Sequence, residues 1–186
     1  MNAEWRLQVV WIVAAGLLGL AVSSVCVGVL RLSRPLFVAP YATLTALFLY
    51  AYFRWSGVTL WTEFRRRWTW GLLGSIGISA LVVGNVLSQP VSGRQQGLRL
   101  ALSMAWLGIV YGFADALLLS VMPVLAALQA FTVVGWTRNW AGRLASGAAA
   151  LCASLWVTLA YHFGFPEYRG ATIFAPAIGN SAFTLG

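Results

Sequence analysis

Residues 100–137 read LALSMAWLGIVYGFADALLLSVMPVLAALQAFTVVGWT and contain one charged side chain, the carboxylate of Asp115. A charge near the centre of a bilayer costs at least about 2.5 to 3.5 kcal/mol, so acids in membrane segments face a polar interior and mark function. We therefore expect Asp115 to face the inside of a helix bundle and to lie at the functional site. As one helix the run would exceed the thickness of a bilayer. It predicts two spans, or one broken helix with the break near residues 112–115.

The composition places the whole chain in the membrane class. Hydrophobic residues make up 60% of the sequence and charged residues 9%, which leaves no soluble domain. Four further apolar runs each approach or exceed the roughly 20 residues that cross a hydrocarbon core. They are Val9–Leu30, Leu36–Phe53, Trp68–Ser88 and Leu144–Phe165. The sequence predicts an all-α, polytopic transmembrane helix bundle, with residues 1–186 forming a single domain of about six spans and a partial seventh.

The net charge of +8 comes from arginine alone, because the chain contains no lysine. On a soluble domain this excess would suggest nucleic acid, but here the arginines lie between hydrophobic runs. There they act as topology signals and contact lipid headgroups, so we expect membrane lipids and no nucleic acid as partners. The densest group, Arg54 with Arg65–Arg67, predicts a cytoplasmic loop and a cytoplasmic N-terminus in a multi-pass protein of the cell membrane. Residues 54–69 also mix tryptophan with charge, as interfacial amphipathic segments do.

Two rows of residues, each spaced four apart, lie along the last full span. Ala141, Ala145, Ala149 and Ala153 form a row of small residues, which is typical of a helix-packing seam. The second row carries hydroxyls and leads to the only histidine; it consists of Ser146, Ala150, Ser154, Thr158 and His162. These hydroxyls could bond to carbonyls of their own helix, with His162 at its wet end. Alternatively, the second row is a polar track that faces Asp115.

The residues available for catalysis are Asp115, His162 and Glu167. A carboxylate and an imidazole that meet in a low-dielectric bundle could activate water, or help to hold a metal that does so. They could equally form a hydrogen-bonded structural pair. His162 is the candidate metal ligand, although one histidine, two separated cysteines and four acids cannot form a closed tetrahedral site from this chain alone.

Three segments of the C-terminal half follow the pattern of a known family. Residues 112–120, GFADALLLS, are similar to a motif of two glutamates followed by three residues and an arginine. Tyr161-His162-Phe163-Gly164 is similar to a motif of phenylalanine, three residues and histidine, and residues 173–180 are similar to the small-residue helix before a last histidine motif. The chain thus resembles the CAAX protease and bacteriocin-processing (CPBP) family of intramembrane metalloproteases. The resemblance implies a membrane helix bundle that cleaves peptides within the membrane.

The chain departs from this family at residues that carry the chemistry. Ala116 occupies the position of the second glutamate, which activates the water in the family. Ser120 occupies the position of the arginine. The last histidine motif would follow Gly186, so residues 171–186 are interpreted as a partial C-terminal helix. Zinc is expected only if a further helix supplies ligands. We therefore expect little or no metal-dependent peptidase activity from this chain.

Three functions remain open from the sequence. The first is a divergent intramembrane metalloendopeptidase of the CPBP type. The second is a non-catalytic protein that binds a hydrophobic peptide or a lipid in the same cavity. The third is a small transporter or channel subunit in which Asp115 is an ion or proton site. The oligomeric state is not predicted by any of these patterns.

Overall fold

The structure, a computed structural model, describes residues 4–59, 61, 65, 69 and 97–169. Within these residues every regular element is a helix and no strand occurs. Four helices are long and apolar enough to cross a membrane: Glu4–Val29, Arg34–Ser56, Gly97–Val134 and Trp140–Phe163. The predicted all-α fold of membrane-length helices is therefore confirmed.

The predicted count of about six spans and a partial seventh is not confirmed. The predicted span Trp68–Ser88 lies almost entirely outside the described residues, and the partial helix 171–186 lies wholly outside them. The predicted interfacial segment 54–69 lies partly outside them. Its first three residues belong to the end of a membrane-length helix, Arg34–Ser56.

The described elements follow in chain order. α1 spans Glu4–Ser23 and continues as a π-helical segment, Ser24–Val29; α2 spans Arg34–Ser56. The next run begins with α4 (Gly97–Ser103), the π-helical segment Met104–Val110 and α5 (Tyr111–Asp115). It continues with the π-helical segment Ala116–Val121 and α6 (Met122–Val134). A 3-10 turn, Trp136–Arg138, leads to α7 (Trp140–Phe163), and a second one, Pro166–Tyr168, follows it.

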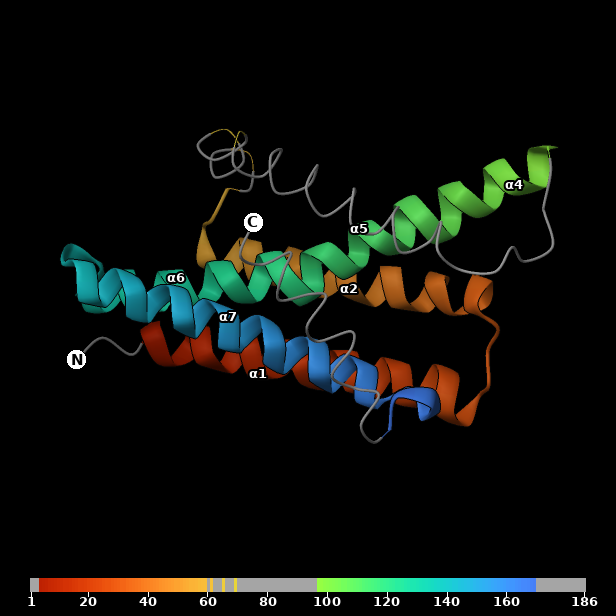
Figure 1. Cartoon of the computed structure of the whole chain (residues 1–186), viewed down its shortest axis with the longest axis horizontal. Coiled ribbons are helices and arrows are strands. Elements are labelled where there is room, and N and C mark those ends of the chain that lie inside the picture. The colour runs from red at the N-terminus through yellow and green to blue at the C-terminus, as the bar shows by residue number, and fades with distance from the viewer. Residues whose placement is uncertain (1–3, 60, 62–64, 66–68, 70–96, 170–186) are drawn as a thin grey trace, which may run out of the picture.

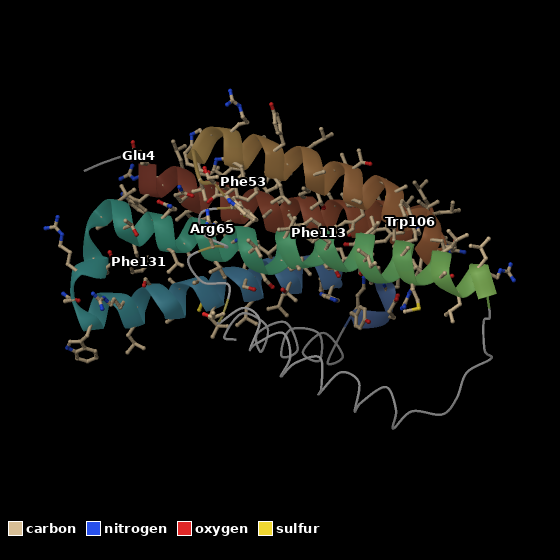
Figure 2. The ribbon with its side chains drawn as sticks, turned by 90° about the horizontal axis from the view of Figure 1, so that it is seen from above. Glu4, Phe53, Arg65, Trp106, Phe113 and Phe131 are labelled. Atoms are coloured by element: carbon tan, nitrogen blue, oxygen red, sulfur yellow. The ribbon has the colours of Figure 1, made fainter. Side chains whose placement is uncertain are left out.

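The run from α4 to α6 is one continuous helix, so the prediction that it forms two spans is wrong. Helical elements follow one another without a gap from Gly97 to Val134, and Figure 2 shows Trp106 and Phe131 far apart along the same ribbon. The sequence predicts a break in this helix at Gly112 and Asp115. The backbone instead takes wider π-helical turns on both sides of α5. Such turns occur often at functional sites. The irregular turns therefore flank the residues where a break was expected, and they widen the helix instead of interrupting it.

Pro123 gives a physical reason for the second π-helical segment. Proline has no N–H to donate to the carbonyl four residues earlier, and its ring clashes with that carbonyl in an α-helix. Here the affected carbonyl is that of Leu119, which lies within the wide turn before Pro123. In lipid a carbonyl released in this way must find another donor.

The turn from α6 to α7 reverses the chain at the end of the bundle where α1 begins (Figure 1). Gly135 ends α6 in the left-handed region, with φ of 79°, and Asn139 caps α7 by accepting a hydrogen bond from the N–H of Gly142 at 2.7 Å. Because the preceding run is one helix, Arg138 and Arg143 lie on the side of the N-terminus. Two spans would have placed both arginines on the other side.

α1, α6 and α7 pack against one another most extensively, and α2 lies against α1 and the α5 region. Small residues permit close approach: a Cβ at Gly16 would meet the side chain of Trp156, and one at Gly19 would meet Tyr161. On α7, however, the predicted alanine seam is mostly wrong, because Ala141 is exposed and only Ala153 of that row is buried. The buried face is the hydroxyl-bearing row, in which Ser146, Ala150, Ser154 and Thr158 are all buried.

Candidate functional site

Asp115 is the last residue of α5 and lies inside the bundle, as the cost of exposing a carboxylate to lipid predicts. Its Oδ1 accepts a hydrogen bond from the hydroxyl of Tyr41 on α2 at 2.6 Å. Tyr41 is 1% exposed and Asp115 is partly exposed, so the bond lies at a partly buried position. Tyr111 is a second hydrogen-bond partner of this carboxylate, and within the described residues Asp115 makes no ion pair.

Two more tyrosines complete what we call the tyrosine cluster, namely Tyr41, Tyr111 and Tyr161. Tyr111 lies one helical turn before Asp115 and so shares its face of the helix. The hydroxyls of Tyr111 and Tyr161 are 2.8 Å apart, within hydrogen-bonding distance. The ring of Tyr41 lies 5.8 Å from that of Tyr111 and 5.2 Å from that of Tyr161, between centroids. Three phenols from α2, α5 and α7 therefore gather around one carboxylate.

The hydroxyl row of α7 contacts the helix that carries Asp115. Ser154 donates a hydrogen bond across the bundle to the carbonyl of Leu119 at 2.8 Å, the carbonyl that Pro123 leaves without its usual donor. Ser146 instead bonds to the carbonyl of Arg143 on its own helix. Ser146 thus bonds within α7, as the first alternative expects, whereas Ser154 bonds to the helix that carries Asp115.

Replacing Ser154 with alanine is expected to lower the free energy of unfolding by about 1 kcal/mol, because the Leu119 carbonyl loses a donor in an apolar setting. Reversible unfolding in mixed detergent, followed by circular dichroism, measures this change. Ser146→Ala is the matched control, since its hydroxyl bonds within α7, and it should change stability by a few tenths of a kcal/mol. Equal losses in both variants would contradict the role given to the bond between helices.

His162 lies near the end of α7, next to the tyrosine cluster. Its Nδ1 is 2.9 Å from the carbonyl oxygen of Thr158, one turn earlier on the same helix. Its ring lies 5.0 Å from that of Tyr161 and 5.2 Å from that of Tyr168. Sequence reasoning placed His162 at the wet end of the hydroxyl row, and its half-buried side chain at the edge of a cavity agrees with that position.

This cavity has a volume of about 310 Å³, and three of the residues discussed above line it. His162 and the exposed Glu167 line it from the end of α7 and the turn after it. Tyr111 lines it from α5 and so separates it from Asp115. The full lining consists of Arg34, Phe37, Val38, Leu107, Tyr111, His162, Phe165, Glu167 and Tyr168. The volume lies at the small end of the range of about 300 to 1,000 Å³ for ligand sites.

The three predicted catalytic residues are thus distributed over two neighbouring places. His162 and Glu167 share the cavity, while Asp115 lies behind Tyr111 in the tyrosine cluster. Among the described residues no three histidine, cysteine, aspartate or glutamate side chains gather closely enough to hold a metal ion. The proposed zinc ligand His162 therefore has no ligand set around it in this part of the chain.

The tyrosine cluster was not identified from sequence. Tyr111 could have been found, because it lies four residues before the only acid in its run. Tyr161 adjoins His162, but one residue along a helix turns a side chain by about 100° and gives no reason to favour it. Tyr41 comes from a distant span, so only the tertiary structure could bring it to Asp115.

Comparisons with protein-family models, with curated proteins and with solved structures find no match. The resemblance to CPBP metalloproteases therefore stays a prediction from the sequence.

Proposed function

We propose that this protein is a small transport protein of the membrane in which Asp115 binds and releases a proton. The observation that carries the proposal is the hydrogen bond from Tyr41 to Asp115, made between helices without an ion pair in the described residues. An ionised carboxylate in that position keeps much of its desolvation cost, and binding a proton removes the charge. An ion pair would offset part of this cost while the charge remained. A carboxyl group that binds and releases a proton needs a route by which the proton reaches water.

The cavity supplies such a route. Tyr111 contacts both Tyr161 and the cavity, where His162 and Glu167 offer groups that exchange protons. The cavity is lined by Arg34 at the start of α2 and by residues after α7, so it lies toward the end of the bundle opposite the N-terminus (Figure 1). A proton would therefore reach Asp115 from that side, with the phenols as the last donors and acceptors.

The orientation proposed for this site has the N-terminus in the cytoplasm and the protein in the cell membrane. Arg6, Arg54, Arg138 and Arg143 lie at the N-terminal end of the bundle, and Arg31, Arg34, Arg99 and Arg169 lie at the other end. In the sequence the run Arg65–Arg67 follows Arg54, and it adds to the first group. Cytoplasmic ends carry the larger number of basic residues. The cavity would then open on the outer side.

The peptidase hypothesis has less support from the same residues. Ala116 cannot act as the base, and His162 directs Nδ1 to a carbonyl of its own helix. A hydrophobic peptide or lipid remains a candidate occupant of the cavity, but Asp115 would lie behind its wall. Proton binding is the function in which Asp115 and its tyrosines take a direct part.

A hydrophobic carbodiimide tests the proposal, because it modifies the proton-bound form of carboxyl groups in apolar surroundings. In proteoliposomes we expect modification at Asp115, located by peptide mass spectrometry, with a rate that falls as the pH is raised. Asp115→Asn should abolish both the modification and proton flux reported by an entrapped pH dye. Glu4→Gln, at an exposed residue of α1, is the control and should leave both unchanged.

Three outcomes would overturn the proposal. The first is modification that does not depend on pH. The second is protection by sodium ions at constant pH, which would make Asp115 a cation site. The third is proton flux that is unchanged in Asp115→Asn.

A further inference from the structure

A second cavity lies at the opposite end of the bundle from His162 and is separate from the proposed proton site. It is a groove of about 580 Å³ between the start of α1 and the end of α6. Figure 2 shows Glu4 and Phe131, which mark those two ends, on the same side of the molecule. We call it the α1–α6 groove; its lining includes Trp5, Val9, Phe131, Val134 and Trp136.

The lining of the groove is apolar and partly open. Val9 is 44% exposed and Val134 is 47% exposed, so the walls can accept a long apolar group from the side. Trp5 and Trp136 stand where α1 begins and α6 ends, which is the position that tryptophans take at headgroup depth. The groove therefore extends from the interface toward the hydrocarbon core, as an acyl chain does.

Arginines lie beside both tryptophans. The guanidinium of Arg6 is over the ring of Trp5, 5.5 Å from its centroid. Arg143 donates from Nε to the carbonyl of Thr137 at 3.2 Å, which holds its guanidinium next to the residue after Trp136. Arg138 belongs to the same turn as Trp136. Against these three cations the described residues at this end offer one carboxylate, that of Glu4.

We infer that the α1–α6 groove binds an anionic phospholipid of the bilayer, with one acyl chain along Val9 and Val134 and the phosphate beside Arg6 and Arg143. Charge complementarity selects this occupant, because an apolar groove rimmed by arginines favours a lipid with a negative headgroup over a zwitterionic one. The proposed cytoplasmic position of the N-terminus agrees with it, since anionic lipids are concentrated in the cytoplasmic leaflet.

Native mass spectrometry of the full chain in detergent tests this inference. Phosphatidylglycerol and phosphatidylcholine with the same acyl chains are titrated separately, and the affinity of the first bound lipid is compared. Each basic residue near an anionic headgroup contributes about fivefold in affinity. We expect phosphatidylglycerol to bind at least about fivefold more tightly, and Arg6→Gln/Arg143→Gln to remove this preference. Arg99→Gln, at the other end of the bundle on α4, is the control and should preserve it.

A second variant tests the position of the acyl chain. Val134→Trp places a large ring in the groove from an exposed position. It should therefore weaken the binding of both lipids while the far-ultraviolet circular dichroism stays unchanged. The inference fails if the two lipids bind equally to the unmodified chain, or if Arg99→Gln loses as much selectivity as the double variant. It also fails if Val134→Trp converts a dimer to a monomer, because the occupant would then be a second copy of this chain.

Discussion

Replacing Gly164 with alanine is expected to destabilise the protein by about 1 to 3 kcal/mol, because it forces an extra atom into a packed contact between helices. Gly164 follows α7, and a Cβ there would overlap the hydroxyl and Cβ of Ser23 on α1. Ser23 is fully buried and donates to the carbonyl of Tyr161 at 2.7 Å. The clash therefore disrupts the contact between α1 and α7. It also displaces Tyr161, a member of the tyrosine cluster.

Thermal unfolding in detergent measures this effect, and Gly147→Ala is the matched control. Gly147 lies within α7, and a Cβ there would meet no atom within 4 Å. That substitution should be neutral or stabilising, since alanine favours helices over glycine by up to about 1 kcal/mol. If Gly164→Ala unfolds at the same temperature as Gly147→Ala, the packing described between Ser23 and Gly164 is wrong.

Replacing Tyr41 with phenylalanine is expected to lower the free energy of unfolding by about 1 to 3 kcal/mol, because a partly buried carboxyl oxygen loses the Tyr41 hydroxyl as a donor. The ring packing should be preserved, since Tyr41 stacks on Phe37 with centroids 5.2 Å apart and phenylalanine keeps the same shape. Tyr50→Phe is the control on the same helix, as Tyr50 is 67% exposed. It should leave stability unchanged.

A double-mutant cycle with Asp115→Asn separates the hydrogen bond from general packing. If Tyr41 acts through Asp115, the cost of Tyr41→Phe should change when the carboxylate is already an amide, giving a coupling energy of about 0.6 to 1.7 kcal/mol. Costs that simply add would show that Tyr41 stabilises the bundle without regard to Asp115.

The sequence predicted the parts of the fold that depend on one segment at a time. Hydropathy and length identified the helices around Val9–Leu30 and Leu36–Phe53, because lipid requires each backbone polar group to be satisfied within its own helix. The interior position of Asp115 followed from the cost of a charge in lipid. Each of these predictions needs only local composition and the bilayer as solvent.

The parts that depend on pairs of segments could not be predicted in the same way. On α7 the alanine row and the hydroxyl row have the same spacing, so periodicity alone cannot choose which one is buried. Pro123 on another helix favours burial of the hydroxyl row, because the carbonyl of Leu119 needs a hydrogen-bond donor. Ser154 supplies that donor, and alanine has none. The partners of Asp115 were missed for the same reason, since Tyr41 and Tyr161 lie on other helices.

The length of the α4–α6 helix leads to a mismatch with the membrane. Its 38 residues extend for about 57 Å at 1.5 Å per residue, whereas the hydrocarbon core is about 30 Å thick. Even at a tilt of about 40° the core would cover only about 26 residues. Roughly a dozen residues must therefore lie outside the hydrocarbon or thicken the bilayer around them. α4 has no buried residue, and Leu98 is 76% exposed, so this end of the helix is expected to rest in the headgroup layer and to favour thicker membranes.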